Sequence, residues 1–302
     1  MAKTDFLTLN DLSQSALFKV LERAHALKKD YQAREFTQSL SQHVLAMIFE
    51  KSSTRTRVSF EAGMTQLGGS AIFLSPHDTQ LGRGEPLEDT ARVLSEMVSA
   101  VMIRTDHHEK LVRFADAATI PVINGLSDSC HPCQLLADIQ TMQDVFGDVQ
   151  GLKVAWIGDG NNVCHSYLEA AGIFGFELII ATPPGYQPAA EWIERANGHV
   201  TFVDSPQDAA RDAQVITTDV WASMGQENET DERLNAFDGY QITPELLDLA
   251  ADNACFLHCL PAHEGEEIAP NLFADPRTET VWAQAGNRLH AQKALLEHLI
   301  IG

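Results

Sequence analysis

Basic residues, cysteines and long apolar runs are all scarce in this 302-residue chain. Lys and Arg number 21 against 42 Asp and Glu, which gives a formal net charge of −21. This charge disfavours a general nucleic-acid binder and a protein held on an anionic membrane surface. No stretch approaches the ~18–20 consecutive apolar residues of a transmembrane helix. The sequence therefore predicts binding neither to nucleic acid nor to a membrane.

The five cysteines are too few, and odd in number, for a disulfide framework. The amino-terminal residues do not resemble a secretory signal, because Asp5, Asn10 and Asp11 interrupt any apolar core. We therefore expect a reduced, cytoplasmic protein.

The composition that remains is that of a folded α/β protein. Hydrophobic residues make up 44% of the chain, and its length suggests two domains. Apolar runs alternate with helical patterns, which favours parallel sheets flanked by helices. A long helix predicted over 135–146 ends at Gly147, so we place the first domain at 1–146 and the second at 147–287. We expect the C-terminal helix, 288–302, to pack back on the first domain.

The expected elements follow from apolar runs and helix stop signals. Helices are predicted over 53–67, 87–98, 163–174 and 288–299. Strands are predicted over 44–49, 71–74, 100–104, 122–124, 154–157, 178–182, 200–203, 215–219 and 254–260.

The segment 49–57 combines a strand end, a hydroxyl-rich turn and a helix start. Free backbone N–H groups and the helix dipole at such a start attract anions, and the guanidinium groups of Arg55 and Arg57 match phosphate oxygens. The alternative is an ordinary N-cap with two solvated arginines. The P-loop pattern is absent, so ATP hydrolysis is not indicated.

The segment 158–162, Gly-Asp-Gly-Asn-Asn, follows a predicted strand and suggests a dinucleotide site. However, Val163 replaces the third glycine of that fingerprint, and no acid ends the next strand. We therefore interpret Asn161 and Asn162 as amide contacts to a small polar substrate. An NAD-dependent oxidoreductase remains the disfavoured alternative.

Three shorter motifs carry polar groups at the ends of predicted elements. His131 could polarise a carbonyl, and Asp219 could accept a hydrogen bond from an ammonium group. Capping turns and buried packing are the alternative interpretations. Cys259 could join a zinc site with His131, Cys133 and His263, but their spacing fits no standard ligand pattern.

Taken together, the motifs resemble the aspartate/ornithine carbamoyltransferase family. They are Ser53-Thr54-Arg55-Thr56-Arg57, His131-Pro132-Cys133-Gln134, Asp219-x-x-Ser223-Met224-Gly225 and His258-Cys259-Leu260-Pro261. The last two resemble its ornithine-specific branch. The resemblance covers the whole chain and implies two α/β domains with the active site between them. It also implies that the first domain binds carbamoyl phosphate, that the second binds L-ornithine, and that no cofactor or metal is needed.

The resemblance assigns roles to individual residues. The catalytic residues would be Arg55, Arg104, His131, Asp219 and Cys259. The ornithine-binding residues would be Asn162, Asp219, Ser223 and Met224. Carbamoyl phosphate would be bound by Ser53, Thr54, Arg55, Thr56, Gln80, Arg104, His131, Gln134, Cys259, Leu260 and Arg288.

The resemblance further implies a homotrimer or a multiple of trimers, in which the loop 75–87 brings Gln80 to the neighbour's site. Two departures stand out: Glu264 replaces a common arginine, and the segment 282–286 lacks acidic residues. The alternatives are carbamoyl transfer to putrescine, N-acetylornithine or aspartate, and a catalytically idle partner protein.

Overall fold

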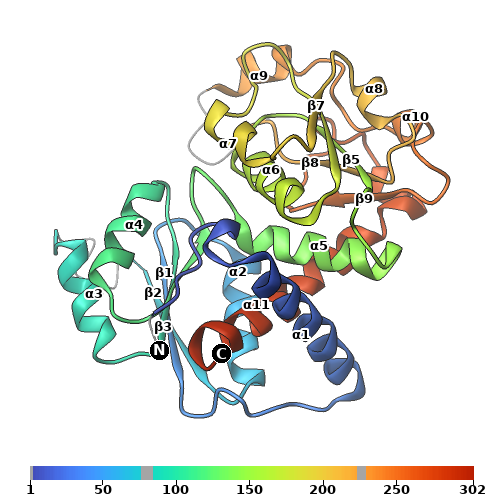
Figure 1. Cartoon of the computed structure of the whole chain (residues 1–302). Coiled ribbons are helices and arrows are strands. Elements are labelled where there is room, and N and C mark those ends of the chain that lie inside the picture. Colours follow the sequence, from blue (N-terminus) through green and yellow to red (C-terminus); the bar gives the residue numbers. More distant parts are fainter. Residues whose placement is uncertain (1–2, 76–83, 223–228) are drawn as a thin grey trace. The chain divides into compact units, whose positions relative to one another are not determined.

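The computed structural model describes residues 3–75, 84–222 and 229–302 (Figure 1). The chain divides into two compact units, which we call unit 1 (residues 1–140 and 286–302) and unit 2 (residues 141–285). The divisions fall inside two helices, α5 (Pro132–Phe146) and α11 (Thr280–Ile300). The substrate-domain limits proposed from the sequence, at 146 and 287, stay a prediction.

Unit 1 is built on a parallel sheet in the order β2-β1-β3-β4. Its strands are β1 (Val44–Phe49), β2 (Ser70–Leu74), β3 (Ala100–Arg104) and β4 (Val122–Leu126). The chain leaves β1 in one direction to form β2 and later returns to form β3 on its other side. The order therefore reverses between β1 and β3, which is where open α/β sheets bind ligands.

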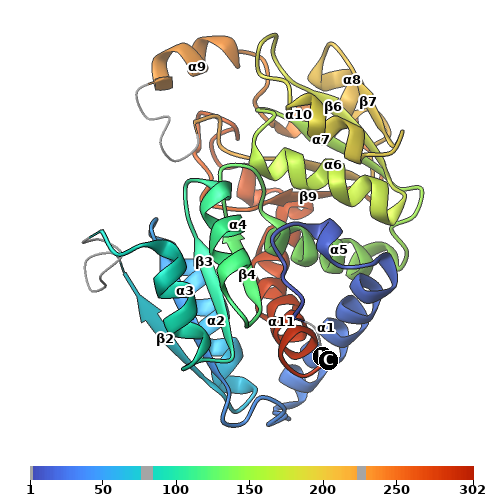
Figure 2. The same ribbon diagram turned by 60° about the vertical axis from the view of Figure 1, so that its left-hand side comes forward.

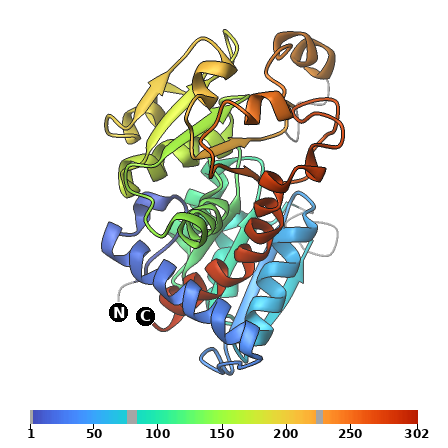
Figure 3. The same ribbon diagram turned by 90° about the vertical axis from the view of Figure 1, so that its right-hand side faces the viewer.

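Helices cover both faces of this sheet. On one face, α3 (Leu87–Ser95) and α4 (His108–Ala117) pack on β1, β3 and β4 through a common apolar core (Figure 2). Right-handed crossovers place α2 (Thr54–Gln66) on the other face. There α2 lies close to α11, and α1 (Gln14–Ala33) is joined to α11 by the Arg23–Glu297 ion pair (Figure 3).

Unit 2 is built on a second parallel sheet in the order β7-β6-β5-β8-β9. Its strands are β5 (Lys153–Ile157), β6 (Glu177–Ala181), β7 (Val200–Phe202), β8 (Val215–Thr218) and β9 (Cys255–His258). Here the order reverses between β5 and β8. The segments that follow these two strands are the expected position of a ligand.

Helices also cover both faces of the second sheet. On one face the ring of Trp156 in β5 contacts Tyr167 of α6 (Asn162–Phe174), against which α7 (Ala190–Arg195) packs. On the other face Ile157 joins a core with α8 (Pro206–Ala210) and α10 (Pro244–Leu247). The described residues also form α9 (Thr230–Ala236) and the 3₁₀ turns Leu272–Ala274 and Pro276–Thr278 in unit 2, and the 3₁₀ turn Leu9–Asp11 in unit 1.

The predicted class, two parallel-sheet α/β domains, is confirmed, but several element limits were wrong. The strand predicted over 254–260 ends at His258, because Leu260 has a left-handed backbone with φ of 59°. The last helix begins at Thr280, eight residues before the predicted start at Arg288. Within the described ranges, no helix has the length and apolarity to cross a membrane.

Candidate functional site

The first candidate site lies in unit 1, where β1 and β3 end. Ser53 caps α2, and its Oγ accepts the Thr56 N–H at 3.3 Å. The cap orients the first turn of α2, whose remaining N–H groups and dipole favour an anion. Thr54, Arg55 and Thr56 therefore form the first turn of a helix whose terminus attracts anions, and their role as phosphate ligands stays a prediction.

Arg288 of α11 joins three of the predicted residues. Its Nη2 donates to Thr56 Oγ1 at 2.8 Å, and its Nη1 lies 3.3 Å from His131 Nε2. Nη1 also donates to Gln134 Oε1. Arg288 is only 2% exposed, so its contacts form in an interior where charge-assisted hydrogen bonds are strong. One buried guanidinium thus brings together the start of α2 and the first turn of α5.

His131 is a neutral imidazole in this setting. Burial lowers its pKa well below the usual value, and the charges of Arg288, Arg104 and Arg55 lower the pKa further. Because an arginine can only donate, His131 Nε2 accepts from Arg288 and the ring proton resides on Nδ1. His131 therefore supplies a dipolar N–H group, while the three arginines supply the positive charge.

Gln134 has a fixed amide orientation. Its Oε1 accepts from Arg288, and its Nε2 donates to Asp138 Oδ1 at 2.8 Å. An amide oxygen can accept a second hydrogen bond, so Oε1 remains suited to an N–H donor of a substrate.

A polar network that we did not predict joins the ends of β1 and β3. Glu50 accepts from Thr105 Oγ1 at 2.5 Å and from Lys110 Nζ at 2.8 Å. Thr105 follows Arg104, a predicted site residue that is 7% exposed. Glu50 therefore links the ends of β1 and β3, which are followed or occupied by predicted phosphate ligands. Its position directly after an apolar strand was the signal available in the sequence.

The second candidate site lies in unit 2, at the reversal between β5 and β8. Asp219 follows β8, and its Oδ1 accepts from the Val220 N–H at 2.8 Å and from Cys259 Sγ at 3.0 Å. Its Oδ2 accepts from Asn161 Nδ2 at 2.8 Å. The structure thus brings the predicted residues Asp219 and Cys259 into direct contact.

Asn161 and Asn162 take different positions. The Asn161 side chain accepts the N–H groups of Val163 and Cys164 as the N-cap of α6 and also donates to Asp219. Asn162 is the first residue of that helix. Asn161, which the sequence analysis interpreted as a substrate contact, thus caps α6 and orients the Asp219 carboxylate.

Cys259 and Leu260 form a turn after β9. Leu260 has a left-handed backbone, and its N–H donates to His258 Nδ1 at 2.9 Å. His258 Nε2 lies 3.1 Å from Glu267 Oε1, and both side chains are fully buried. Three other predicted residues, Gln80, Ser223 and Met224, lie outside the described residues.

Two groups among the described residues have ligand atoms close enough to share a metal ion. They are Asp219, His258 and Cys259, and His263, Glu266 and Glu267. In the first group both ring nitrogens of His258 already take part in hydrogen bonds, to Leu260 and Glu267. A metal bound there would have to break one of these bonds.

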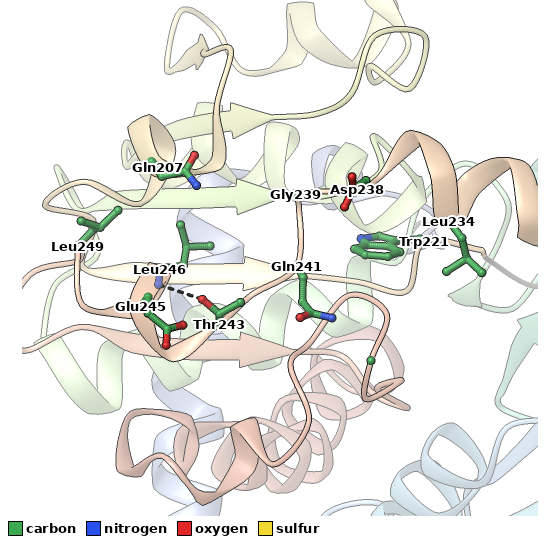
Figure 4. A pocket seen from close by; sticks show the side chains of 11 residues that line it. Gln207, Trp221, Leu234, Asp238, Gly239, Gln241, Thr243, Glu245, Leu246 and Leu249 are labelled. Carbon is green, nitrogen blue, oxygen red and sulfur yellow. Dashed lines mark hydrogen bonds between the residues drawn. The ribbon is translucent and has the colours of Figure 1, made fainter.

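A separate cavity in unit 2 has a volume of about 600 Å³ (Figure 4). Its lining includes Trp221, Leu234, Gln241, Thr243 and Leu246. Among the predicted site residues that the structure describes, none lines this cavity.

Comparison with known families matches both halves of the chain. Residues 4–144 match the family described as "Aspartate/ornithine carbamoyltransferase, carbamoyl-P binding domain". Residues 150–299 match the companion "Asp/Orn binding domain".

Individual relatives are similar over nearly the full length. The ornithine carbamoyltransferase of Halorhodospira halophila is 57% identical over 297 residues, covering 98% of this chain and 99% of its own. That of Acinetobacter baumannii strain AYE is 56% identical over 300 residues, covering 99% and 98%. The solved structure of the Pyrococcus furiosus protein of that name superposes with a TM-score of 0.95 at 45% identity, covering 100% and 98%.

Proposed function

We propose that this chain, which belongs to the aspartate/ornithine carbamoyltransferase family, transfers the carbamoyl group of carbamoyl phosphate to the side-chain amine of L-ornithine. The products are L-citrulline and phosphate. The observation that carries the proposal is that relatives named for this reaction match the chain almost from end to end. The two clusters at the strand reversals supply groups suited to the two substrates.

The cluster in unit 1 holds carbamoyl phosphate. Ser53, Thr54, Arg55, Thr56 and Arg104 bind the phosphate, and Arg288 completes the anion pocket. Arg104 and the neutral His131 contact the carbonyl oxygen, where negative charge develops in the transition state. Gln134 and the Leu260 carbonyl bind the carbamoyl NH2. Gln80 of a neighbouring subunit adds a contact from its loop.

The cluster in unit 2 binds L-ornithine. Asp219, Asn162, Ser223 and Met224 hold the α-amino and carboxyl groups, and Cys259 stands near the side-chain amine. That amine must lose a proton before it attacks the carbonyl carbon, so an acceptor beside it assists the step. The new C–N bond forms, the C–O bond to phosphate breaks, and phosphate leaves with the bonding electrons. Neither a metal nor a cofactor takes part in this scheme.

The chain forms a homotrimer or a multiple of trimers. Supporting this, β2 is the edge strand of its sheet, and four exposed apolar side chains come from α2, β2, α3 and the turn after α3. They are Val58, Ile72, Val93 and Met97. A sheet edge beside exposed apolar side chains favours association with another chain.

The protein acts in the cytoplasm, in the direction of arginine biosynthesis. All five cysteines are free thiols, as suits a reducing compartment. A solved structural relative from Campylobacter jejuni, 41% identical with a TM-score of 0.91, is named an anabolic ornithine carbamoyltransferase.

Measuring kcat/KM for a panel of amines tests the substrate assignment. A site that pairs a zwitterionic head rejects analogues lacking it, because its own buried polar groups are then left unpaired. We expect putrescine, which has no carboxylate, to react at least ~10²-fold less efficiently than L-ornithine. N-acetylornithine and L-aspartate complete the panel. If any of the three exceeds L-ornithine, the ornithine assignment is wrong although carbamoyl transfer stands.

A further inference from the structure

A buried carboxylate lies directly behind the turn that carries Cys259 and Leu260. Glu267 Oε1 accepts the His263 backbone N–H at 2.6 Å and lies 3.1 Å from His258 Nε2. Because the Leu260 N–H can only donate, His258 Nδ1 is an acceptor without a proton. The ring proton therefore resides on Nε2 and is donated to Glu267. A continuous chain of hydrogen bonds runs from the carboxylate to the Leu260 backbone.

The turn needs such support because its backbone is not one that leucine prefers. Leu260 lies in the left-handed region, which side chains other than glycine rarely adopt unless surrounding contacts hold them. The His258 ring holds the Leu260 N–H, and Cys259 Sγ donates to Asp219 on the other side. Displacing His258 would therefore shift both the Cys259 thiol and the Leu260 carbonyl.

We propose that Glu267 and His258 are positioning residues that fix the Cys259–Leu260 turn and so set how the attacking amine is presented. The inference rests on the proposed function, because it assigns the turn to the amine. Glu267 fixes the tautomer and orientation of His258, and His258 fixes the Leu260 N–H. Neither side chain touches a substrate in this scheme. Both act through the turn.

The first test compares Glu267→Leu and Glu267→Gln with Glu266→Gln. Glu266 is the adjacent, half-buried carboxylate, whose partner is His263 and not His258. The Glu267→Leu change would leave the His258 N–H without its acceptor. We expect this variant to raise the KM for ornithine about tenfold or more and to lower kcat, with Glu267→Gln intermediate. We expect Glu266→Gln to match the wild type.

Two further readouts separate positioning from loss of folded protein. Partial unfolding lowers the amount of active enzyme, and thus kcat, but leaves the KM for ornithine and the Kd for inorganic phosphate unchanged. Alkylation of Cys259 by iodoacetamide, located by mass spectrometry, reports on the turn without any turnover. Cys259 is the partly exposed cysteine and the other four are buried, so its modification rate can be followed selectively.

The second test asks whether His258 acts by providing a hydrogen-bond acceptor for the Leu260 N–H. In His258→Asn the side-chain oxygen can accept the N–H two residues ahead, whereas His258→Leu offers no acceptor. We expect His258→Asn to retain at least about tenfold more kcat/KM than His258→Leu.

The outcomes distinguish the two proposals. Equal KM for ornithine and equal Cys259 alkylation in Glu267→Leu and wild type would overturn the positioning role, as would equal activity of the two His258 variants. A wild-type protein that forms no citrulline would overturn the proposed function. In that case, a changed alkylation rate in Glu267→Leu would still support the role of Glu267 in holding the turn.

Discussion

Arg288 contacts three side chains that lie more than 150 positions away in the sequence. At the scale of single residues, the sequence around Thr56, His131 and Gln134 could be explained either by ordinary helix capping or by an anion-binding site. Capping of separate turns does not explain one almost completely buried guanidinium that contacts all three of these side chains. The contacts therefore favour an anion site over three unrelated turns.

Arg55 provides a direct test of that site. We expect Arg55→Ala to lower kcat by roughly 10²-fold or more, as loss of a preorganised charge-stabilising donor does. Arg57→Ala is the matched control, since Arg57 pairs with Glu61 and lies over the Phe73 ring. Steady-state measurement of kcat for both variants tests this prediction. An Arg55 variant within about threefold of wild type contradicts the assignment.

The neutral state of His131 has a consequence for stability in acid. Its pKa is depressed in the folded chain, so the unfolded chain binds the extra proton more readily. The stabilising contribution is present above the unfolded-state pKa of about 6.5 and is lost as pH falls below it.

We therefore expect the free energy of unfolding to fall less between about pH 7 and pH 5 in His131→Asn than in wild type. Denaturant titrations of both proteins at several pH values measure the difference. Parallel pH dependence in the two would show that His131 titrates normally.

At the scale of elements, apolar runs were enough to predict the strands, because parallel strands buried on both faces are continuous apolar segments. Asp219 was predicted as a site residue because it lies at the end of a predicted strand. The contacts of Asn161 with Asp219 and of Glu50 with Thr105 could not be predicted, since they depend on which strands become neighbours. The predicted start of the last helix, Arg288, was wrong because the helix already begins at Thr280 and continues through Gly286.

Arg233 of α9 connects that helix to the carboxyl end of β5 and to the segment after β8. Its Nη1 contacts Asp159 Oδ2 at 2.9 Å and the Trp221 carbonyl at 2.8 Å, and its Nε contacts Glu229 at 3.0 Å. Burial raises the pKa of Asp159 to about 6, although Arg233 opposes this shift. Arg233 thus contacts both described flanks of the proposed ornithine-binding residues 223 and 224.

Replacing Arg233 therefore tests this element. We expect Arg233→Gln to raise the KM for ornithine about tenfold or more, with little change in the Kd for inorganic phosphate. Glu232→Gln, an exposed change on the same helix, is the control. Equal ornithine KM values in the Arg233 variant and wild type would show that ornithine binding does not depend on the contacts of Arg233.

At the scale of the whole molecule, the proposed trimer predicts sites completed by a neighbour. Light scattering should give three times the 33.2 kDa chain mass, or a multiple of it. An inactive Gln80→Ala protein refolded with an inactive Arg55→Ala protein should regain partial activity, because some sites then combine intact residues from two chains. Confirmed mixed oligomers without citrulline formation would indicate sites built within one chain.

Unit 1 has an unusual relation to the order of synthesis, because it contains both the first 140 residues and the last 17. Arg288, Lys293 and Glu297 leave the ribosome after all of unit 2, although their partners Thr56, Gln66 and Arg23 emerge near the start. Domains otherwise fold in order as they are synthesised. A nascent chain can therefore assemble the sheet of unit 1 early, but the proposed anion pocket is complete only when translation reaches α11. A premature stop there would yield a protein that lacks Arg288 and, with it, part of the proposed phosphate site.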